Sequence, residues 1–379
     1  MPLYPFLCAI IGLYVIVRVA LPSRLSWPLK IVVSILLFAC AEKLYLTRLY
    51  YGSLTAYSMS VPVAIITGIL NAFVIMLFLL ALLRDICWLL RFLLRRKRSR
   101  SPRSGQIGLT AAAAFLAVFS VWSALKVPAV SEVTLSIPNL PPALTGLRIV
   151  QLSDLHIGPI FKEKWLSDVV REVNRLHPDI IAITGDLSDG HPSSQGKNLA
   201  PLKDLKARYG TYIVLGNHDY YASAPQWLTF LRNLGLTVLT NEHVSLEITG
   251  SGQTARFTVA GVTDPAAQRT GMEAPNVQKA LKGSSGIRLL LAHNPVLAKG
   301  SASAGADIQL SGHTHGGQIL PMAPLVAQFN QGYSFGIYTV GDMQLYVSRG
   351  TGLWSGVPIR LLCSSEITLL TLQPESPKK

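Results

Sequence analysis

A short polar motif, Gly216-Asn217-His218-Asp219, ends the strongly apolar run Tyr212–Leu215 and constrains this chain more than any other feature. The parallel strands of α/β sheets hold ligands at their carboxyl ends, where side chains from several strands meet. The motif places two candidate metal ligands and one candidate acid at such an end. Taken alone, it is equally compatible with an ordinary polar turn that carries a solvated histidine.

The same arrangement occurs at four more places, so a set of five unrelated turns is a poor explanation. In each case a run of apolar residues stops at aspartate, histidine or asparagine. The four further polar ends contain Asp154 with His156, Asp186, His293, and His313 with His315. The sequence therefore predicts one site that is assembled from the ends of five strands.

These motifs, D-x-H, G-D, G-N-H-D, H and G-H-x-H in this order, resemble those of the calcineurin-like metallophosphoesterase superfamily. The resemblance covers about residues 147–372, and every motif is complete. It implies a four-layer α/β/β/α sandwich with two sheets face to face and helices outside. A looser resemblance, carried by Val347–Gly352 and Pro358-Ile359-Arg360, is to a bacterial branch of membrane-associated or exported phosphodiesterases and lipid-precursor hydrolases.

The resemblance also implies two divalent metal ions as cofactors, with Mn, Zn and Fe as the candidates. Carboxylate, imidazole and amide oxygen are suitable ligands for such ions. The ligands implied for the first ion are Asp154, His156 and His315. Those implied for the second ion are Asn217, His293 and His313, and the carboxylate that bridges both ions is Asp186.

The same resemblance leaves His218 free of metal, to stabilise transition-state charge or protonate the leaving oxygen, with Asp219 orienting it. A hydroxide on or between the metals would attack phosphorus, so that no protein nucleophile is needed. The sequence agrees with this hypothesis, because it contains no G-x-S-x-G elbow, Walker loop or kinase-type glycine loop.

Composition divides the 379-residue chain into two regions. Half of the residues are apolar and only 14% are charged, which is too apolar for a wholly soluble protein. Residues 1–126 carry a net charge of +12 and residues 127–379 a net charge of +2. We expect a transmembrane region over 1–126 and a catalytic domain over 127–379. Because the positive charge accompanies the apolar segments, nucleic acid is not an expected partner.

Four apolar stretches are long enough to cross about 30 Å of hydrocarbon as helices. They are Pro5–Leu21, Leu29–Leu46, Val61–Leu83 and Ile107–Leu125. The second stretch is the weakest candidate, because charged residues stand near both of its ends. The first lacks the early basic region and the cleavage site of a signal peptide, so it is also interpreted as a span.

The connection between the third and fourth stretches, residues 84–106, carries eight basic residues and sets the expected orientation. The positive-inside rule assigns this loop to the cytoplasm. The catalytic domain is then expected outside the cytoplasm of a multi-pass protein of the inner membrane. Residues 85–94, which mix tryptophan, leucine and phenylalanine with arginine, are expected to continue the third helix at the membrane surface.

Beyond residue 127 the pattern predicts a strand over 133–137, helices over 163–176, 198–208 and 224–234, and a hairpin between 244–248 and 257–259. Three histidines outside the motifs are interpreted as structural: His177, His191 and His243. Cys363 is the only cysteine of this region, so no disulfide within the domain is possible.

The function predicted from the sequence is hydrolysis of a lipid-linked or envelope phosphoester by a membrane-anchored enzyme, with membrane lipids as partners. One alternative is a general extracytoplasmic phosphodiesterase or phosphatase that acts on soluble substrates. A second alternative is a membrane tether that keeps the metal centre for structure alone. The apolar segment Gln318–Tyr338 is a candidate specificity loop, and it is equally compatible with packing under the sheet.

Overall fold

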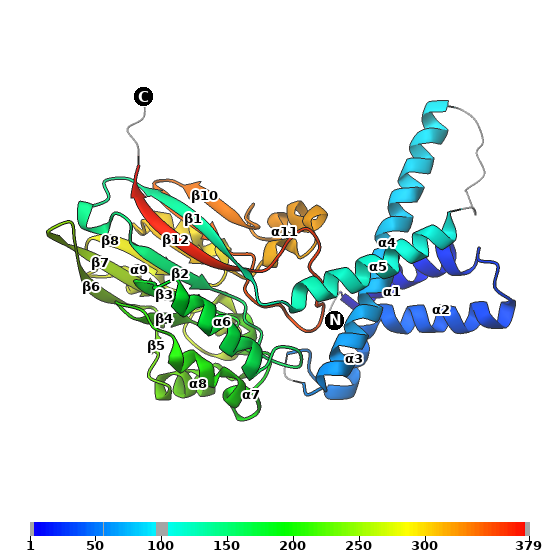
Figure 1. Ribbon diagram of the computed structural model, residues 1–379, viewed down its shortest axis with the longest axis horizontal. Coiled ribbons are helices and arrows are strands. Elements are labelled where there is room, and N and C mark those ends of the chain that lie inside the picture. The colour runs from blue at the N-terminus through cyan, green and yellow to red at the C-terminus, as the bar shows by residue number, and fades with distance from the viewer. Residues whose placement is uncertain (1–3, 56, 96–104, 376–379) are drawn as a thin grey trace. The chain divides into compact units, whose positions relative to one another are not determined.

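The computed structural model describes residues 4–55, 57–95 and 105–375, and these residues form two compact units (Figure 1). The helical unit comprises Met1–Leu125 together with Ser355–Leu361. The catalytic unit comprises Lys126–Trp354 and Leu362–Lys379. The grouping differs from the sequence-based division at one place, because seven residues late in the chain belong with the helices.

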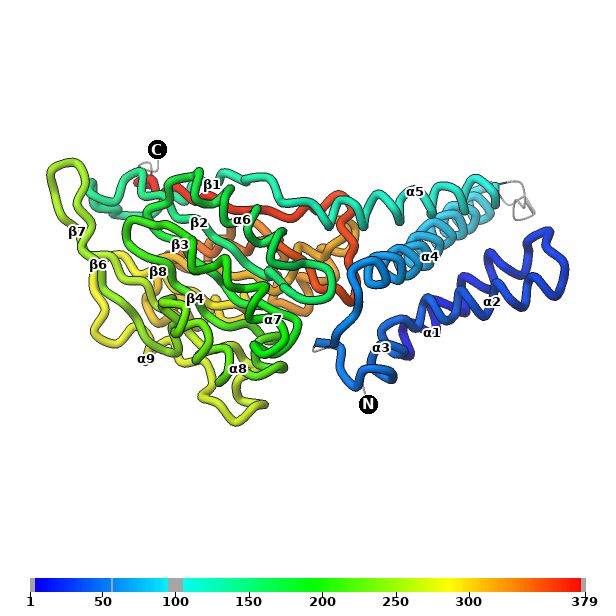
Figure 2. The backbone as a smooth tube through the Cα atoms, turned by 60° about the horizontal axis from the view of Figure 1, so that its bottom comes forward, coloured from blue at the N-terminus to red at the C-terminus, as the bar shows by residue number. Residues whose placement is uncertain are grey.

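The helical unit consists of helices with apolar faces. Its elements are α1 (Tyr4–Val15), a π-helical turn (Ile16–Ala20), α2 (Trp27–Ala41), α3 (Lys43–Tyr51), α4 (Val61–Arg95) and α5 (Gln106–Leu125). The long helix α4 contacts α1, α2 and α5, and Figure 2 shows α4 and α5 side by side. Tyr14 and Arg18 both bond the Asp85 carboxylate at 2.6 Å, so an ion pair joins the first helical segment to α4.

Two of the described helices, over Val61–Leu94 and Gln106–Leu125, are long and apolar enough to cross a membrane. The other two predicted spans are shorter apolar helices, over Tyr4–Ala20 and Trp27–Ala41. The prediction of one continuous span over Leu29–Leu46 is wrong, because α2 ends at Ala41 and α3 starts at Lys43. Glu42 separates them with a ψ of 16°, outside the helical range.

The predicted extension of the third helix is helical, because α4 continues to Arg95. Five of the eight basic residues in the predicted cytoplasmic loop lie in 96–104, outside the described residues. They are Arg96, Lys97, Arg98, Arg100 and Arg103.

Two six-stranded sheets form the centre of the catalytic unit. The first has the order β1 (Ala129–Ile137), β12 (Glu366–Pro374), β2 (Arg148–Leu152), β3 (Ile180–Thr184), β4 (Thr211–Val214) and β5 (Thr237–Val238). The second has the order β10 (Gly336–Val340), β11 (Met343–Val347), β9 (Ile308–Ser311), β8 (Ile287–Leu291), β7 (Gln253–Gly261) and β6 (Glu242–Gly250). Strands β2 to β5 are parallel to one another, and so are β7, β8, β9 and β11.

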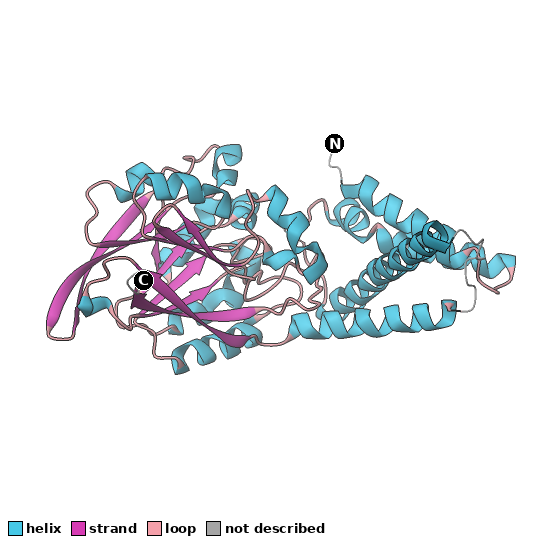
Figure 3. Ribbon diagram, turned by 90° about the horizontal axis from the view of Figure 1, so that it is seen from above, coloured by secondary structure: helices cyan, strands magenta, loops and turns pink. Residues whose placement is uncertain are grey.

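Aliphatic side chains of both sheets share one buried core, to which β2 contributes Ile149, β3 contributes Ile180 and β8 contributes Leu289. Each fully buried side chain of this kind stabilises the fold by about 1.5–3 kcal/mol. Because the apolar residues fill the space between the sheets, the polar residues that follow the strands are left at the strand ends. Figure 3 shows the strands of this unit flanked by helices.

The helices of the catalytic unit are α6 (Glu163–Arg175), α7 (Pro192–Leu199), α8 (Asn217–Asn233), α9 (Val277–Leu281), α10 (Ala298–Ser303) and α11 (Ala323–Phe329). The helix predicted over 163–176 is confirmed as α6, which buries Leu166, Val169, Val170 and Val173. The predicted hairpin is confirmed as the antiparallel pair β6 and β7.

One helix prediction needs correction, and another corresponds to part of a longer helix. The segment predicted as a helix over 198–208 contains the end of α7 and a 3₁₀ turn over Ala200–Asp204, because Pro201 restricts the backbone there. The helix predicted over 224–234 is confirmed as the second part of α8 (Asn217–Asn233). Ser223, two residues before Pro225, breaks the helical geometry with φ −175° and ψ 86°. The polar motif after β4 therefore forms the first turn of a kinked helix.

Candidate metal centre

The residues predicted as metal ligands meet at the carboxyl ends of five strands. In the first sheet, Asp154 and His156 follow β2, Asp186 follows β3 and Asn217 follows β4. In the second sheet, His293 follows β8, and His313 and His315 follow β9. Because β2, β3 and β4 are mutually parallel, and so are β8 and β9, each sheet collects these side chains at one edge.

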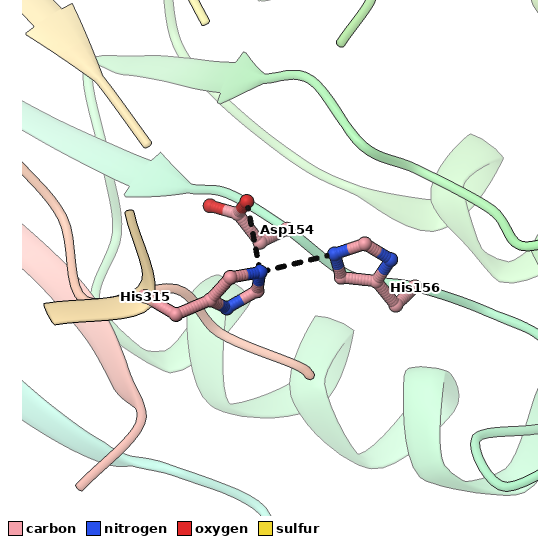
Figure 4. A group of neighbouring side chains, drawn as sticks. All are labelled: Asp154, His156 and His315. Atoms are coloured by element: carbon pink, nitrogen blue, oxygen red, sulfur yellow. Dashed lines mark hydrogen bonds and ion pairs between the residues drawn. The ribbon is translucent and has the colours of Figure 1, made fainter. Parts of the chain in front are cut away.

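One group of ligands is formed by Asp154, His156 and His315, shown in Figure 4. The Nε2 atoms of the two histidines lie 3.2 Å apart, and His315 Nε2 lies 3.5 Å from the Asp154 carboxylate. All three residues are buried. Two imidazole nitrogens and a carboxylate that face one another at these distances form a donor set suited to one divalent cation.

A second group is formed around Asn217. Its side-chain oxygen lies 3.2 Å from His293 Nε2 and 2.8 Å from His313 Nδ1. The Asp186 carboxylate lies between the two groups, with Oδ2 3.6 Å from His156 Nε2 and 3.4 Å from His293 Nε2. The seven side chains thus fit two neighbouring cations with Asp186 between them. The assignment of each ligand to one ion stays a prediction.

The backbone at five of these residues adopts the left-handed conformation, which is uncommon for residues other than glycine. The φ angles are 54° at Asp154, 45° at His156, 52° at Asp186, 71° at His313 and 50° at His315. Such a conformation costs on the order of 1–3 kcal/mol per residue and is found preferentially at functional sites. The fold therefore accepts local strain in order to direct these side chains at one another.

Two glycines make the close packing possible. A Cβ atom on Gly216 would lie 2.3 Å from Asp186 Oδ1, and one on Gly312 would lie 2.3 Å from Asp154 Oδ2. Both distances are far below van der Waals contact. Any other residue at these positions would push a predicted ligand out of place.

Hydrogen bonds to the outer ring nitrogens fix how two histidines present their inner nitrogens. His293 Nδ1 donates to the Thr184 carbonyl at 2.7 Å, and His156 Nδ1 donates to Asp189 at 3.0 Å. In the neutral form of each ring the proton is therefore on Nδ1, and the lone pair of Nε2 faces the other ligands. This tautomer is the one that binds metal ions through Nε2.

Charge also favours cations at this site. Burial alone would raise the pKa of Asp186, but the positive charges of His293 and His218 outweigh it and hold that pKa well below its usual range. Burial, followed by the charge of His293, lowers the pKa of His313 to about 4. Asp186 and His313 are therefore in the state that metal binding requires. Burial opposes protonation of His293, but the charge of Asp186 raises its pKa well above the usual range, so a cation that binds there displaces a proton from His293.

His218 lies beside the predicted ligands and is held by a carboxylate that was not predicted from the sequence. Its Nδ1 donates to Asp189 Oδ1 at 2.8 Å, and the same oxygen accepts the hydrogen bond from His156. Asp189 is fully buried. Burial would raise the pKa of this carboxyl, but the charges of His156 and the hydrogen bonds from both imidazoles lower it. The sequence offered one clue, since Asp189 stands three residues after Asp186 on the same strand end.

The expectation that Asp219 orients His218 is wrong. The Asp219 carboxylate instead accepts backbone N–H groups from Gly216, Leu187 and Ser188, at 2.9–3.2 Å. Asp219 thus caps the start of α8 and joins that turn to the loop after β3. The motif placed this aspartate next to His218 in sequence, but the first turn of the helix directs the two side chains to different partners.

Three further observations complete the surroundings of the site. The Trp354 ring packs edge-on against the His218 ring, with centroids 5.8 Å apart. Backbone N–H groups of His218 and His313 donate to Asp186 and Asp154 at 2.8 Å and 3.1 Å. His243, interpreted as structural, bonds the Ala280 carbonyl at 2.7 Å through Nδ1. It does not belong to any of the metal-ligand groups found among the described residues.

Comparison with known proteins identifies the family. Residues 147–317 match the model of the family described as calcineurin-like phosphoesterase. A protein of Campylobacter jejuni named an uncharacterized metallophosphoesterase is 36% identical over 272 residues, which is 71% of this chain and 69% of the relative. The chain belongs to the calcineurin-like metallophosphoesterase family. It therefore contains a metal-dependent phosphoesterase domain of a family that uses two divalent metal ions.

Two vertebrate relatives of this metallophosphoesterase, from Bos taurus and Danio rerio, are both named "transmembrane protein with metallophosphoesterase domain". The bovine protein is 40% identical over 269 residues, covering 68% of this chain and 60% of the relative. The zebrafish protein is 36% identical over 317 residues, which cover 80% of this chain and 72% of the relative. The relatives thus include both vertebrate and bacterial proteins. They do not test the looser resemblance to a bacterial branch of the family.

Proposed function

We propose that this metallophosphoesterase is a membrane-anchored hydrolase of an amphiphilic phosphoester, either lipid-linked or otherwise part of the cell envelope. The observation that carries the proposal is the convergence of seven ligands beside a histidine that is held by a buried carboxylate. A site that served structure alone would need no additional acid next to its ligands.

When two divalent ions are bound, they supply an activated water and neutralise charge on the phosphate oxygens. The residues of the chain supply positioning and a proton. Water forms a new P–O bond and releases one proton to solvent, while the P–O bond to the leaving group breaks and His218 donates its proton to the departing oxygen. A proton from solvent then restores the charged form of His218. Asp189 holds the imidazole of His218 in place, because its carboxylate fixes Nδ1 and leaves Nε2 available for that proton transfer.

Burial opposes protonation of His218, but the charge of Asp186 and the hydrogen bond to Asp189 outweigh it and raise the pKa of His218 to about 9. The imidazole is therefore protonated at neutral pH, as a proton donor must be. Replacing His218 with Ala separates the enzyme from a metal-binding tether. Loss of turnover with the metal content unchanged supports an enzyme in which His218 acts, and unchanged turnover contradicts that role. A wild-type protein that binds metal and hydrolyses no phosphoester would support the tether.

An amphiphilic substrate is supported by apolar surface on both units. The helical unit contains the two long apolar helices over Val61–Leu94 and Gln106–Leu125. In the catalytic unit, a 3₁₀ turn over Leu320–Met322 and the helix α11 follow the predicted ligand His315, and they expose Leu320, Leu325 and Phe329. Phe329 is 79% exposed. An apolar surface next to the site is suited to the chain of a lipid-like substrate.

The proposal includes membrane passages by α4 and α5 and a catalytic domain on the extracytoplasmic side. The eight basic residues of 84–106 support this orientation through the positive-inside rule. A reporter that is active only outside the cytoplasm should be active when fused after Lys379 and silent when fused at Ser104. The reverse pattern would contradict the orientation and move the catalytic domain to the cytoplasmic face.

The test of the substrate class compares two phosphoesters with the same leaving group, one with a long apolar chain and one that is soluble in water. Chain binding positions the phosphorus over the site, so the amphiphile should react at least tenfold faster, on the order of one binding contact of 1.4 kcal/mol or more. Equal rates in detergent and in bilayers would contradict the lipid assignment and favour a general phosphodiesterase.

A further inference from the structure

A short segment near the end of the chain connects the catalytic histidine with the helical unit. Ser355–Leu361 follows directly after Trp354 and is grouped with the helices. Ser355, Ile359 and Arg360 are each only 1% exposed. Seven residues that interrupt the catalytic unit are thus packed among the helices, although nothing in their composition marks them as membrane-spanning.

Three helices hold this segment. The Lys43 amine, at the start of α3, donates to the carbonyls of Ser355 at 3.3 Å and Gly356 at 3.0 Å. In α5, the Ser120 carbonyl accepts a hydrogen bond from the backbone N–H of Arg360 at 3.1 Å. In α4, Gly68 lies so close to Pro358 that a Cβ atom would be 2.7 Å from the proline Cγ. The segment is fixed at its start, middle and end.

Lys43 is an unusual residue for this position. It is buried, and it lines a cavity of about 350 Å³ whose other walls are mostly apolar, with Leu36, Leu46 and Leu70 among them. Burying an ammonium group is costly unless hydrogen bonds compensate for the lost water. The two carbonyls provide that compensation. The position of the amine therefore depends on the 355–361 segment, and the position of the segment depends on the amine.

Trp354, the residue directly before this segment, contacts the proposed proton donor His218. The Trp354 ring packs edge-on against His218, whose Nδ1 is bound to Asp189. His218 is therefore positioned by a carboxylate on one side and by an indole ring on another. The backbone of that indole residue continues through one peptide bond into Ser355, the first residue that Lys43 holds.

We propose that Lys43 is a positioning residue for the hydrolysis. By fixing the carbonyls of Ser355 and Gly356 it fixes Trp354 against His218, so that the short helix α3 of the helical unit takes part in aligning the proton donor. This inference rests on the proposed function, in which His218 donates a proton to the departing oxygen. Lys43 would act by keeping His218 aligned for that proton transfer. Each contact used lies within one unit, and the link between them is the covalent bond from Trp354 to Ser355.

The test uses the full-length, metal-loaded protein in detergent and replaces Lys43 with Met, which keeps the length of the side chain but removes the donors. Lys30→Met is the matched control, because Lys30 also donates to a backbone carbonyl, that of Leu21, and forms no hydrogen bond with 355–361 in the described part of the chain. Two substrates are compared, one with a nitrophenyl leaving group and one with an alkyl leaving group. The alkoxide needs the proton of His218, whereas nitrophenolate departs without it.

Lys43→Met should lower kcat for the alkyl ester on the order of tenfold to a hundredfold, the range that misplacing a catalytic group produces. The nitrophenyl ester should lose less than about threefold, and KM should change little for either substrate. Lys43→Arg should restore most of the alkyl rate, because guanidinium can donate to both carbonyls and the cavity has room for it. Lys30→Met should behave like the wild type.

A second pair of variants disturbs the segment from another helix and leaves Lys43 intact. Gly68→Ala places a Cβ against Pro358 and should produce the same selective loss on the alkyl ester. Gly108→Ala, where a Cβ would meet nothing within 4 Å, is its control and should have no effect. Alanine is a better helix former than glycine, so neither change weakens its helix.

The inference is overturned if Lys43→Met and Gly68→Ala leave the alkyl rate unchanged, or if both esters slow by the same factor. An equal loss would indicate a structural role without a part in aligning His218. Failure of the proposed function has a different result, since the wild-type protein would then hydrolyse neither ester in the presence of metal.

Discussion

The two units of the protein place opposite kinds of side chain on their surfaces and in their interiors. The catalytic unit buries ionisable groups, and Asp154, Asp186 and His293 are at most 2% exposed. The helical unit exposes large apolar side chains, with Trp27 at 68% and Ile107 at 89%. Buried charges require cations or partners, and exposed apolar helices require hydrocarbon. The comparison indicates that hydrolysis depends on metal ions, whereas the location of the protein depends on the membrane. A substitution in the metal centre should therefore change activity without changing membrane association.

The largest expected effect comes from Asp186→Ala. This carboxylate lies between both ligand groups, 3.6 Å from His156 and 3.4 Å from His293, so its loss should remove both ions. We expect kcat to fall by a factor on the order of a thousand or more, the scale at which metal and electrostatic stabilisation act. Elemental analysis and kinetics check this, and extraction from membranes should remain unchanged. Asn217→Ala is the comparison and should weaken mainly one ion.

A smaller effect is expected from Asp189→Asn, and it differs from that of Asp219→Asn. Asp189 accepts from two imidazoles, so the first variant should lower kcat by about a hundredfold or more. Asp219 accepts backbone N–H groups with both oxygens, so an amide would face them with its own donors and cost about 1–3 kcal/mol of stability. Kinetics and thermal unfolding distinguish the two. Equal effects of both variants on kcat would contradict the roles assigned here.

The pH dependence of the catalytic unit should follow His218. Its pKa is raised to about 9 from an ordinary value of 6.5, so the protonated donor is present at neutral pH and is lost as the pH rises through the pKa. Cations held by Asp186, a predicted ligand, would offset part of that increase. We therefore expect kcat/KM to fall as the pH rises, with a midpoint between the ordinary pKa of 6.5 and the raised pKa of about 9. Asp189→Asn removes a charge that raises the pKa and should shift the alkaline limb to lower pH, whereas a shift upward would contradict this.

The smallest effect is expected at α11, where the catalytic unit exposes apolar side chains as the helical unit does. Phe329→Asp places a charge on the exposed apolar surface of α11 and should reduce hydrolysis of an amphiphilic ester by several-fold to tenfold, the cost of losing one apolar contact. Hydrolysis of the soluble analogue should stay unchanged, as measured in detergent and in vesicles. An equal loss on both substrates would place Phe329 in the fold of the domain and not on a lipid-binding surface.

The part of the site that could be predicted from the sequence is the part that repeats. Five apolar runs that end in Asp, His or Asn predict strands whose ends meet, and parallel pairing brings those ends together. Asp189 could not be predicted in the same way. Its role depends on a loop conformation that directs Asp186 and Asp189 to different partners. The left-handed φ of 52° at Asp186 is part of that conformation, and no local sequence pattern predicts it.

The helical unit was less predictable for a different reason. Hydropathy counts apolar residues, so it combined α2 and α3 into one span and did not detect the break at Glu42. It also assigned Ser355–Leu361 to the catalytic domain, because hydrogen bonds from Lys43 and to Ser120 are contacts between residues far apart in the chain. Strand ends follow a local pattern, whereas packing among helices does not.

The most direct test of the account is the dependence of activity on metal. The purified protein should lose its phosphoesterase activity in excess chelator and regain it when Mn²⁺ or another divalent ion is added. Elemental analysis of the active protein should then give two ions per chain, and Asp186→Ala should not recover under the same conditions. Full activity in a preparation from which elemental analysis shows that the metal has been removed would contradict the account.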